Sequence, residues 1–382
     1  MNPLTFAFSR SVLLAIVLSV SLGGPKGRAA DIRYEHLADC ITRALELQKG
    51  ERVLLRYDSD YFAELRGPLE SRIRRAGAVV LGPLEYQAKG VPPLGFGEVI
   101  EDADVYLWLP LRPDLHEVSP QEREALQRWL EKGGARREIH FHWQEGSVLS
   151  DGLPGPHSPA LDQIYQAALD IDYSALSAAQ DRAIALLRSG TIHVTTPAGT
   201  DLRFRVGSRP FNKQDGDASP ARARAARVRV DREIELPAGV LRVAPLEETV
   251  NGTLVIPSAR FGSAVARRLR FSIRNGVITS IQADQNLDAA RAALAAGGEA
   301  ALHFREFGLG FNPKLQAPPE SPSLAYYGYG AGVVRLSLGD NQELGGNVRG
   351  GFTRWFFFPD GTVEVGGRIL VRGGRLSSAG TP

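Results

Sequence analysis

The sequence is poor in cysteine. Of its 382 residues only one, Cys40, is a cysteine. A single cysteine cannot form an internal disulfide, and it excludes a zinc site built from several cysteines. Cys40 lies within the amphipathic pattern HLADCITRALEL, so we interpret it as a small buried hydrophobic residue of a helix, and we expect no cysteine-based metal site.

The sequence also has little net charge. Its 45 lysine and arginine residues nearly balance its 43 aspartate and glutamate residues, which leaves a net charge of +2. Without a strong field of one sign, we expect no nucleic-acid partner and no membrane partner beyond the N-terminal segment. The motifs GxGxxG and GxxxxGK(S/T) follow none of the predicted strands, and GxSxG and HExxH are missing. Nucleotide binding and a serine-triad hydrolase are therefore not indicated.

Long hydrophobic runs are absent except near the N-terminus. Ser11–Leu22 is an apolar run of 12 residues, preceded by Arg10 and followed by small residues. This length is typical of a signal peptide and is short for a membrane span. We predict a signal peptide over residues 1–30, cleaved near Ala29, and a periplasmic or secreted protein. An uncleaved anchor is the alternative.

The first part of the remaining chain alternates between strand and helix patterns. Helices are expected at Tyr34–Leu47, Phe62–Ala76 and Pro120–Lys132, and strands at Arg52–Tyr57, Ala78–Leu84, Val105–Leu109 and Glu138–His142. Alternation at this spacing indicates an α/β layer with a mainly parallel sheet. We assign residues 31–155 to this N-terminal α/β domain.

The second part has a different pattern. A helix is expected at Leu161–Leu187, followed by short strands, one of them at Arg227–Val230, with turns such as Asn275-Gly276. A helix at Leu287–Ala296 and glycine-rich strands to the end complete the pattern. We assign residues 156–382 to a C-terminal, β-rich α+β domain. The expected fold class is α/β in the first domain and α+β in the second.

Several motifs of the second domain resemble those of a known enzyme family. They read REFGLGFNP (305–313), VVRLSLGDN (333–341) and GGNVRGGFTRWFF (345–357), and they are preceded by TPAGTDL (196–202) and ELPAG (235–239). Together they resemble the M29 metallo-aminopeptidases of the aminopeptidase T/S type. The resemblance covers most of the chain after the N-terminal segment, and it implies the M29 fold and a homodimer.

The resemblance also implies where two divalent metals, such as zinc or cobalt, would bind. Of the family's ligand positions only Glu306 keeps its carboxylate. The other positions hold Val240, Arg335, Gln342, Arg354 and Phe356. Valine and phenylalanine have no lone pair to offer, and arginine is a fixed cation that repels a metal. We therefore expect no metal at the M29 positions, no two-metal peptidase activity and no cofactor.

Two interpretations of the arginines remain open. Arg335 and Arg354 could replace the metal charge and bind an anionic ligand together with Glu306, or these residues could form a buried ion network. Either version can include other residues near the matching motifs: Arg232, Arg305, Tyr329, Gln342 and Trp355.

Three functions follow as hypotheses. The first is a peptide or amide hydrolase with Glu306 as general base and Arg335 and Arg354 as oxyanion stabilisers. The second is a non-catalytic protein that binds an acidic small molecule or peptide. The third is a metalloenzyme that uses His140 and His142.

The third hypothesis depends on the pattern His-Phe-His. Alternate residues of a strand point to the same side, so His140 and His142 could hold a metal together with Glu145, Asp151 or His157. The alternative is a strand end with two hydrogen-bonded histidines. The loop Asp215–Ser219 has the polarity of a calcium or magnesium loop without its full spacing, and it is otherwise interpreted as a polar hairpin loop.

Overall fold

The computed structural model describes residues 32–86, 95–111, 118–143, 148–149, 158–315, 323–324 and 326–377. The predicted signal peptide and the predicted domain boundary between residues 155 and 156 lie outside these ranges, so both stay predictions. In the described ranges, none of the helices combines the length and the hydrophobicity that crossing a bilayer requires.

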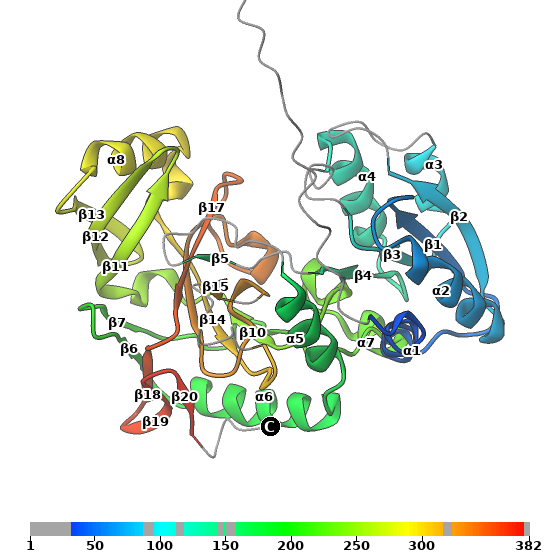
Figure 1. The fold of residues 1–382 in the computed structure, drawn as a ribbon. Helices are drawn as coiled ribbons and strands as arrows, with labels where there is room; N and C mark the ends of the chain where they lie inside the picture. Colours follow the sequence, from blue (N-terminus) through cyan, green and yellow to red (C-terminus); the bar gives the residue numbers. More distant parts are fainter. Residues whose placement is uncertain are drawn as a thin grey trace, which may run out of the picture.

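The N-terminal part is built around a parallel sheet, whose first strands β1, β2 and β3 are drawn in blue and cyan in Figure 1. All neighbouring strands in it run parallel. Its five strands, in the spatial order β2–β1–β3–β4–β9, are β1 (Arg52–Tyr57), β2 (Val79–Glu85), β3 (Val105–Trp108), β4 (Arg137–Phe141) and β9 (Glu233–Leu236). The predicted α/β layer is therefore confirmed.

Helices cover both faces of this sheet: α1 (Tyr34–Leu45), α2 (Ala63–Arg75), α3 (Phe96–Glu101) and α4 (Pro120–Glu131). Val53 and Leu55 of β1 pack in the cluster that contains the buried faces of α1 and α2. Leu54, between them, packs instead in the cluster of α3 and α4. This division follows from the two-residue period of a strand, and it explains why β1 is apolar throughout.

The fifth strand, β9, comes from far beyond the other four in sequence. It pairs with β4 in the register Glu138↔Glu233 and His140↔Glu235. The two parts of the chain are also joined by aromatic side chains, since the ring of Trp143 packs against both Phe62 and Tyr165. One continuous cluster of buried side chains extends from α1 to the last strands. The two parts therefore share a core.

The C-terminal part contains two antiparallel sheets (Figure 1). The first has the order β17–β16–β14–β10–β8. Its strands are β8 (Asn212–Lys213), β10 (Val240–Val243), β14 (Phe304–Gly310), β16 (Val334–Gly339) and β17 (Thr353–Phe358).

The second sheet has the order β13–β12–β11–β7–β6–β18–β19–β20. Its strands are β6 (Ile192–Thr195), β7 (Asp201–Phe204), β11 (Asn251–Phe261), β12 (Ala264–Arg274), β13 (Val277–Gln282), β18 (Thr362–Val365), β19 (Arg368–Arg372) and β20 (Arg375–Leu376). A short pair, β5 (Val148–Leu149) and β15 (Ser323–Leu324), lies apart from both. The expected β-rich domain is confirmed.

Two local predictions in this part are wrong. The single helix expected at Leu161–Leu187 is two helices, α5 (Pro159–Leu169) and α6 (Tyr173–Arg188). The break follows from capping, because the Asp172 side chain accepts a hydrogen bond from the backbone of Ala175 and starts a new helix. The strand expected at 227–230 is largely a 3₁₀ turn, Arg229–Arg232, which follows the short helix α7 (Pro220–Ala225). The helix α8 (Leu287–Ala296) has the predicted bounds.

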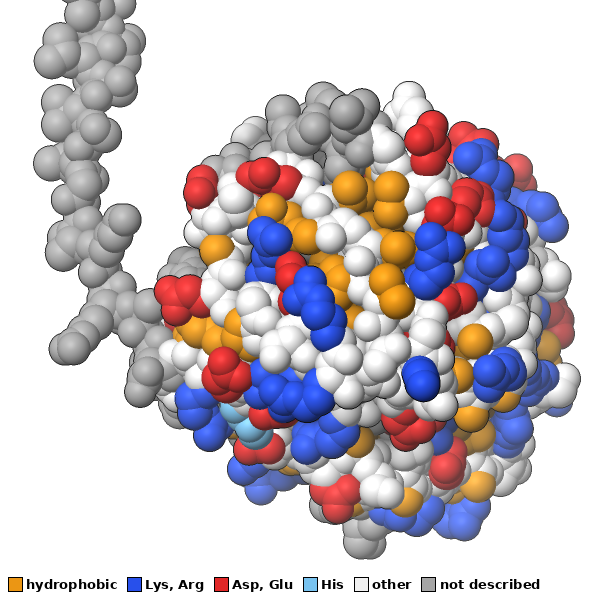
Figure 2. Space-filling view, turned by 90° about the vertical axis from the view of Figure 1, so that its right-hand side faces the viewer, with side chains coloured by type: hydrophobic (Ala, Val, Ile, Leu, Met, Phe, Trp, Pro, Cys, Tyr) orange, Lys and Arg blue, Asp and Glu red, His pale blue; other side chains and the backbone are white. Residues whose placement is uncertain are grey.

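The surface of the N-terminal side carries both signs of charge. Figure 2 shows acidic and basic side chains interspersed on this face, with apolar side chains between them. This face therefore presents no extended field of one sign, in agreement with the small net charge of the chain.

Candidate functional site

The residues at the motif positions meet on the sheet formed by β10, β14, β16 and β17. Arg242 of β10 lies opposite Gly308 of β14, and Gly308 lies opposite Arg335 of β16. A side chain at position 308 would meet the Arg335 Nε atom at 3.2 Å, so this glycine leaves room for guanidinium groups from both sides. Glu306, two residues before it, points to the same side of the sheet.

Glu306 is fully buried and pairs with three guanidinium groups. Its Oε1 atom lies 2.7 Å from Arg335 Nη2, its Oε2 atom lies 3.2 Å from Arg242 Nη2, and Oε2 also pairs with Arg305 Nη1. Glu343 closes the cluster, because its Oε1 atom lies 2.5 Å from Arg242 Nη2 and pairs with Arg305 Nη2. We call these five residues the Glu306 cluster.

The charges of the Glu306 cluster are shifted by burial and by one another. Burial alone would raise the pKa of Glu343, but Arg242 and Arg305 outweigh it and hold this pKa at about 2. Burial, with help from Arg242, lowers the pKa of Arg305 and of Arg335 to about 10. The carboxyl group of Glu343 is therefore ionised and both arginines are cationic at neutral pH.

Arg335, like Arg242 and Glu306, has a buried polar atom without a hydrogen-bond partner among the described residues. The unpaired atom of Arg335 is Nε. Its Nη1 atom lies 3.5 Å from the Tyr327 carbonyl oxygen, and its guanidinium also interacts with the Tyr329 side chain. Its guanidinium carbon lies 5.7 Å from the ring centres of both Tyr329 and Trp355. Trp355 is 39% exposed and is, with Val79, one of the two exposed large hydrophobic residues among those described. The cluster thus has an aromatic rim that reaches the surface.

Register separates Arg354 from this cluster. On β17, Trp355 lies opposite Ser337 and therefore on the face of Arg335, whereas Arg354 lies opposite Leu338 and on the other face. The Arg354 Nη2 atom donates to the Arg260 carbonyl oxygen at 2.5 Å, and its guanidinium lies over the Phe261 ring.

The remaining motif positions are also accounted for. Val240 and Phe356 are buried apolar residues of the core. The Gln342 amide oxygen, in the orientation that satisfies both groups, accepts from Arg349 at 3.3 Å. Arg232 lies beside Gly133 of the N-terminal part, and Tyr329 donates its hydroxyl to Glu235.

An M29-type metal pair does not fit the residues of this centre. Divalent metals need lone-pair donors, and here the single matching carboxylate is already paired with three cations. The pattern of motifs left two members unnoticed, Arg242 and Glu343. Arg242 could have been found from strand alternation, because it lies two residues after the motif position Val240. Glu343 could have been found because it directly follows the motif position Gln342.

A second polar region lies between β4 and β9. Glu138, His140, Glu233 and Glu235 occupy alternate positions of the two paired strands, so they share one face of the parallel sheet. The Glu138 carboxylate lies 3.0 Å from His140 Nε2, beside a cavity of about 220 Å³ that His140 and Glu233 also line. The His140 and His142 rings both pack against Trp108. The suggested third ligands Glu145, Asp151 and His157 lie outside the described residues.

The groups of this cavity titrate away from their ordinary ranges. Burial alone would lower the pKa of His140, but Glu138, Glu233 and Glu235 outweigh it and raise this pKa to about 9. Burial, aided by Glu138 and opposed by Arg229, raises the pKa of Glu233 to about 7. A carboxyl group with this pKa can both give and take a proton near neutrality.

These two shifts predict that stability falls as the pH rises. A group whose pKa is raised by folding stabilises the protein below its unfolded pKa and loses that contribution as the pH rises through its folded pKa. We expect the contribution of Glu233 to the free energy of unfolding to be lost between pH 4.5 and about 7. The contribution of His140 should be lost between pH 6.5 and about 9. For His140 the change should be on the order of 3 kcal/mol.

Urea unfolding at a series of pH values measures this effect. Glu233→Gln should flatten the lower part of the profile, and His140→Gln the upper part. His193→Gln is the matched control, since His193 pairs with Asp201 at 2.8 Å on the surface of the other part. A free energy of unfolding that does not change over this range in the unmodified protein would contradict the prediction.

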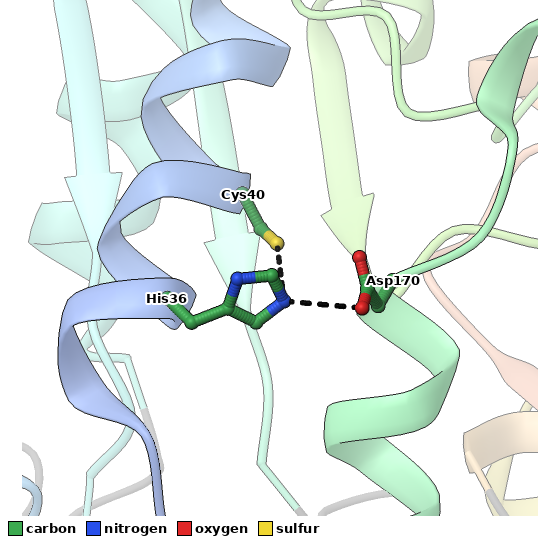
Figure 3. Close-up of side chains that lie close together, drawn as sticks. All are labelled: His36, Cys40 and Asp170. Atoms are coloured by element: carbon green, nitrogen blue, oxygen red, sulfur yellow. Dashed lines mark hydrogen bonds and ion pairs between the residues drawn. The ribbon is translucent and has the colours of Figure 1, made fainter.

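A third group of side chains joins the first helix to α5. His36 and Cys40 lie one turn apart on α1, and Asp170 is the residue that ends α5 (Figure 3). One ligand atom from each residue lies within 4.8 Å of the other two. This arrangement corrects the expectation that Cys40 cannot be part of a metal site, which considered only sites with several cysteines.

Comparison with known proteins shows the family to which the chain belongs. A model of the family described as NicX, 2,5-dihydroxypyridine 5,6-dioxygenase, matches residues 172–377. The chain belongs to the NicX family. No curated protein matches the sequence.

The solved structures agree with this assignment at the level of the fold. The 2,5-dihydroxypyridine dioxygenase from Pseudomonas putida KT2440 is similar with a TM-score of 0.61 and 16% identity, over 91% of this chain and 96% of that one. AmpT from Thermus thermophilus is similar with a TM-score of 0.59 and 15% identity, over 90% of this chain and 99% of that one. The predicted relationship to the M29 aminopeptidases is confirmed as a shared fold, and peptidase activity is not established by it.

The prediction that no cofactor is involved is wrong. The NicX family is described by a dioxygenase activity, and reactions of O₂ in proteins are carried by haem, flavin, copper or non-haem iron. The M29 aminopeptidases, by the resemblance stated above, use metals. The chain itself places His36, Cys40 and Asp170 where an ion could bind. The prediction failed because it considered only the substituted M29 positions.

Proposed function

We propose that this protein binds a small, planar, anionic aromatic molecule at the Glu306 cluster, and that Arg335 and Trp355 make the main contacts. The observation that carries the proposal is the guanidinium of Arg335, which is 3% exposed and lies 5.7 Å from two aromatic ring centres. Its Nε atom has no hydrogen-bond partner among the described residues, and its Nη1 atom makes a long contact of 3.5 Å, so both are donors that a ligand could fill. A carboxylate or phenolate could accept those donors in a charge-assisted pair.

The surroundings of Arg335 support an aromatic ligand. Trp355 is exposed on one side and has the Tyr327 ring 5.9 Å away, so a flat ring could stack against this pair at the rim. Glu306 and Tyr329 would hold the Arg335 guanidinium in place, which reduces the entropy lost on binding. The compound named in the family description, a dihydroxypyridine, is a planar ring with ionisable hydroxyl groups.

The same contacts disfavour the peptidase hypothesis at this place. A general base must reach the proton that it takes up, and the fully buried Glu306 carboxylate is ion-paired with three guanidiniums, two of which donate hydrogen bonds to its Oε2 atom. The binding hypothesis for an acidic small molecule is therefore the better supported of those that the sequence left open.

The test is a binding measurement with tryptophan fluorescence on the full chain. The ligands are 2,5-dihydroxypyridine, pyridine carboxylates and benzoate, with neutral pyridine as the uncharged comparison. We expect the anionic rings to bind and to change the fluorescence of Trp355. Arg335→Gln should weaken binding by about tenfold or more, because a hydrogen bond to a charged group contributes about 1.5–3 kcal/mol.

The controls separate binding from folding. Arg354→Gln removes an arginine from the opposite face of the same sheet and should leave the dissociation constant within about twofold. Trp355→Ala changes an exposed side chain and should weaken binding even if Arg335→Gln proves unstable. Equal losses in the Arg335 and Arg354 variants, or no binding of any anionic ring, would contradict the proposal.

A further inference from the structure

The group formed by His36, Cys40 and Asp170 shares no residue with the Glu306 cluster and lies between α1 and the C-terminal end of α5 (Figures 1 and 3). The His36 Nε2 atom is 3.3 Å from Asp170 Oδ2 and 3.7 Å from Cys40 Sγ. The three side chains therefore meet at a single ring nitrogen.

Hydrogen bonding explains these distances poorly. One imidazole nitrogen carries at most one proton, so it cannot donate fully to a carboxylate and a sulfur at once. A charge-assisted hydrogen bond between a ring nitrogen and a carboxylate is usually about 2.7–2.9 Å long. The surface pair His193–Asp201 has this length, 2.8 Å, whereas the His36–Asp170 distance is 3.3 Å.

The distances do match the edges of a coordination tetrahedron. With the usual Zn–N, Zn–O and Zn–S bond lengths, tetrahedral geometry separates nitrogen from oxygen by about 3.3 Å and nitrogen from sulfur by about 3.6 Å. The corresponding distances here are 3.3 Å and 3.7 Å. We propose that His36, Cys40 and Asp170 bind Zn²⁺ or a similar borderline cation, as a three-ligand site that clamps α1 to α5.

The donor set selects the class of metal. A thiolate and an imidazole favour Zn²⁺, Cu⁺ and related ions over Mg²⁺ and Ca²⁺, which prefer oxygen ligands. Cys40 is buried, whereas the side chains of His36 and Asp170 are 29% and 50% exposed. Water can therefore supply the fourth ligand, and the metal can enter from the solvent side. The Cys40 thiol loses its proton to the solvent when the metal–sulfur bond forms.

The neighbouring cavity has the charge that attracts cations. It has a volume of about 500 Å³ and is lined by Arg43 together with four carboxylates: Glu46, Asp172, Asp215 and Asp217. Arg43 links the cavity to the site, because its Nη2 atom lies 3.7 Å from Cys40 Sγ. Lys213 and Arg222 pair with Asp215, so the negative excess comes from the other three carboxylates. The polar loop Asp215–Ser219 thus contributes to the approach of the ion rather than to its binding.

The experiment is a metal titration of the chelator-treated full chain. With Co²⁺ as the probe we expect one ion per chain and a near-ultraviolet sulfur-to-cobalt charge-transfer band. With Zn²⁺ in competition with a chromophoric chelator, Cys40→Ser, His36→Ala and Asp170→Asn should each weaken binding by about tenfold or more. Zn²⁺ should also raise the Tm of the unmodified protein and leave that of Cys40→Ser unchanged.

Two matched variants test whether the Zn²⁺ binds at His36, Cys40 and Asp170 and not elsewhere. His193→Ala removes a histidine from a His–Asp pair that lacks a thiol, and His140→Gln alters the polar cavity at β4. Neither should change the Zn²⁺ affinity by more than about twofold. A Co²⁺ complex without the thiolate band, or a Cys40→Ser variant with unchanged affinity, would overturn the proposal. Loss of affinity in His140→Gln alone would do the same, since it would place the metal elsewhere.

Discussion

Replacing Glu306 with glutamine should lower the free energy of unfolding by about 3–5 kcal/mol, the largest effect expected of any single side chain in the Glu306 cluster. Glu306 is fully buried and holds Arg242, Arg305 and Arg335. Glutamine keeps the shape but removes the charge. Arg242 and Arg305 would then keep only Glu343, and Arg335 would lose its ion pair, in an environment where water cannot compensate them. Urea unfolding at neutral pH measures the loss.

Glu343→Gln is the matched control for this experiment. Glu343 pairs with two of the same arginines, but its side chain is 28% exposed. Water can replace part of the lost interaction, so we expect this variant to be destabilised by about half as much as Glu306→Gln. Equal effects of the two variants would show that burial does not set the energy of the cluster. A stable Glu306→Gln protein would show that the guanidiniums rearrange to reach solvent.

Gly310→Ala should destabilise the protein by about 3 kcal/mol or more, because there is no space for a side chain at this position. A Cβ atom on Gly310 would lie 2.1 Å from the Gly330 carbonyl oxygen and 2.6 Å from that of Gly328. These are backbone atoms, so relief requires the loop after Tyr327 to move away from β14. Thermal and urea unfolding should both show the loss.

Gly67→Ala is the contrasting substitution. Gly67 lies inside α2, and a Cβ atom there would have no neighbour within 4 Å. Alanine is a better helix former than glycine by about 1 kcal/mol, so this variant should be as stable as the unmodified protein or slightly more stable. If Gly310→Ala behaved like Gly67→Ala, the close approach of the loop to β14 would be refuted.

The two glycines show what can be learned from a sequence. Gly310 lies in the motif REFGLGFNP, within the part of the chain for which the sequence predicted glycine-rich strands. Nothing local marks position 310, since its backbone does not have a positive φ that would require glycine. The requirement comes from a loop about twenty residues later in the chain, and only the folded structure brings that loop into contact.

The Glu306 cluster, too, could be predicted from the sequence only in part. The substitutions of Val240, Arg335 and Phe356 were visible in the motifs, and they were enough to argue against a metal pair of the M29 type. The partners of Glu306 were only partly visible. Arg242 reaches it from β10, the strand paired directly with β14, and Arg354 does not join it because β17 places Trp355 on that face instead. A shift of one residue in a strand exchanges its faces, and register depends on the neighbouring strands.

The sequence by itself determined the alternation that gives a parallel sheet, the β-rich second half, and the loss of lone-pair donors at the M29 positions. These depend on residue type and on short-range periodicity. Only the tertiary structure decided which side chains meet: β9 completes the first sheet from far along the chain, three guanidiniums converge on Glu306, and Asp170 reaches His36 and Cys40. The physical reason is that a site joins residues distant in sequence, and their distances are fixed by packing and register rather than by local preference.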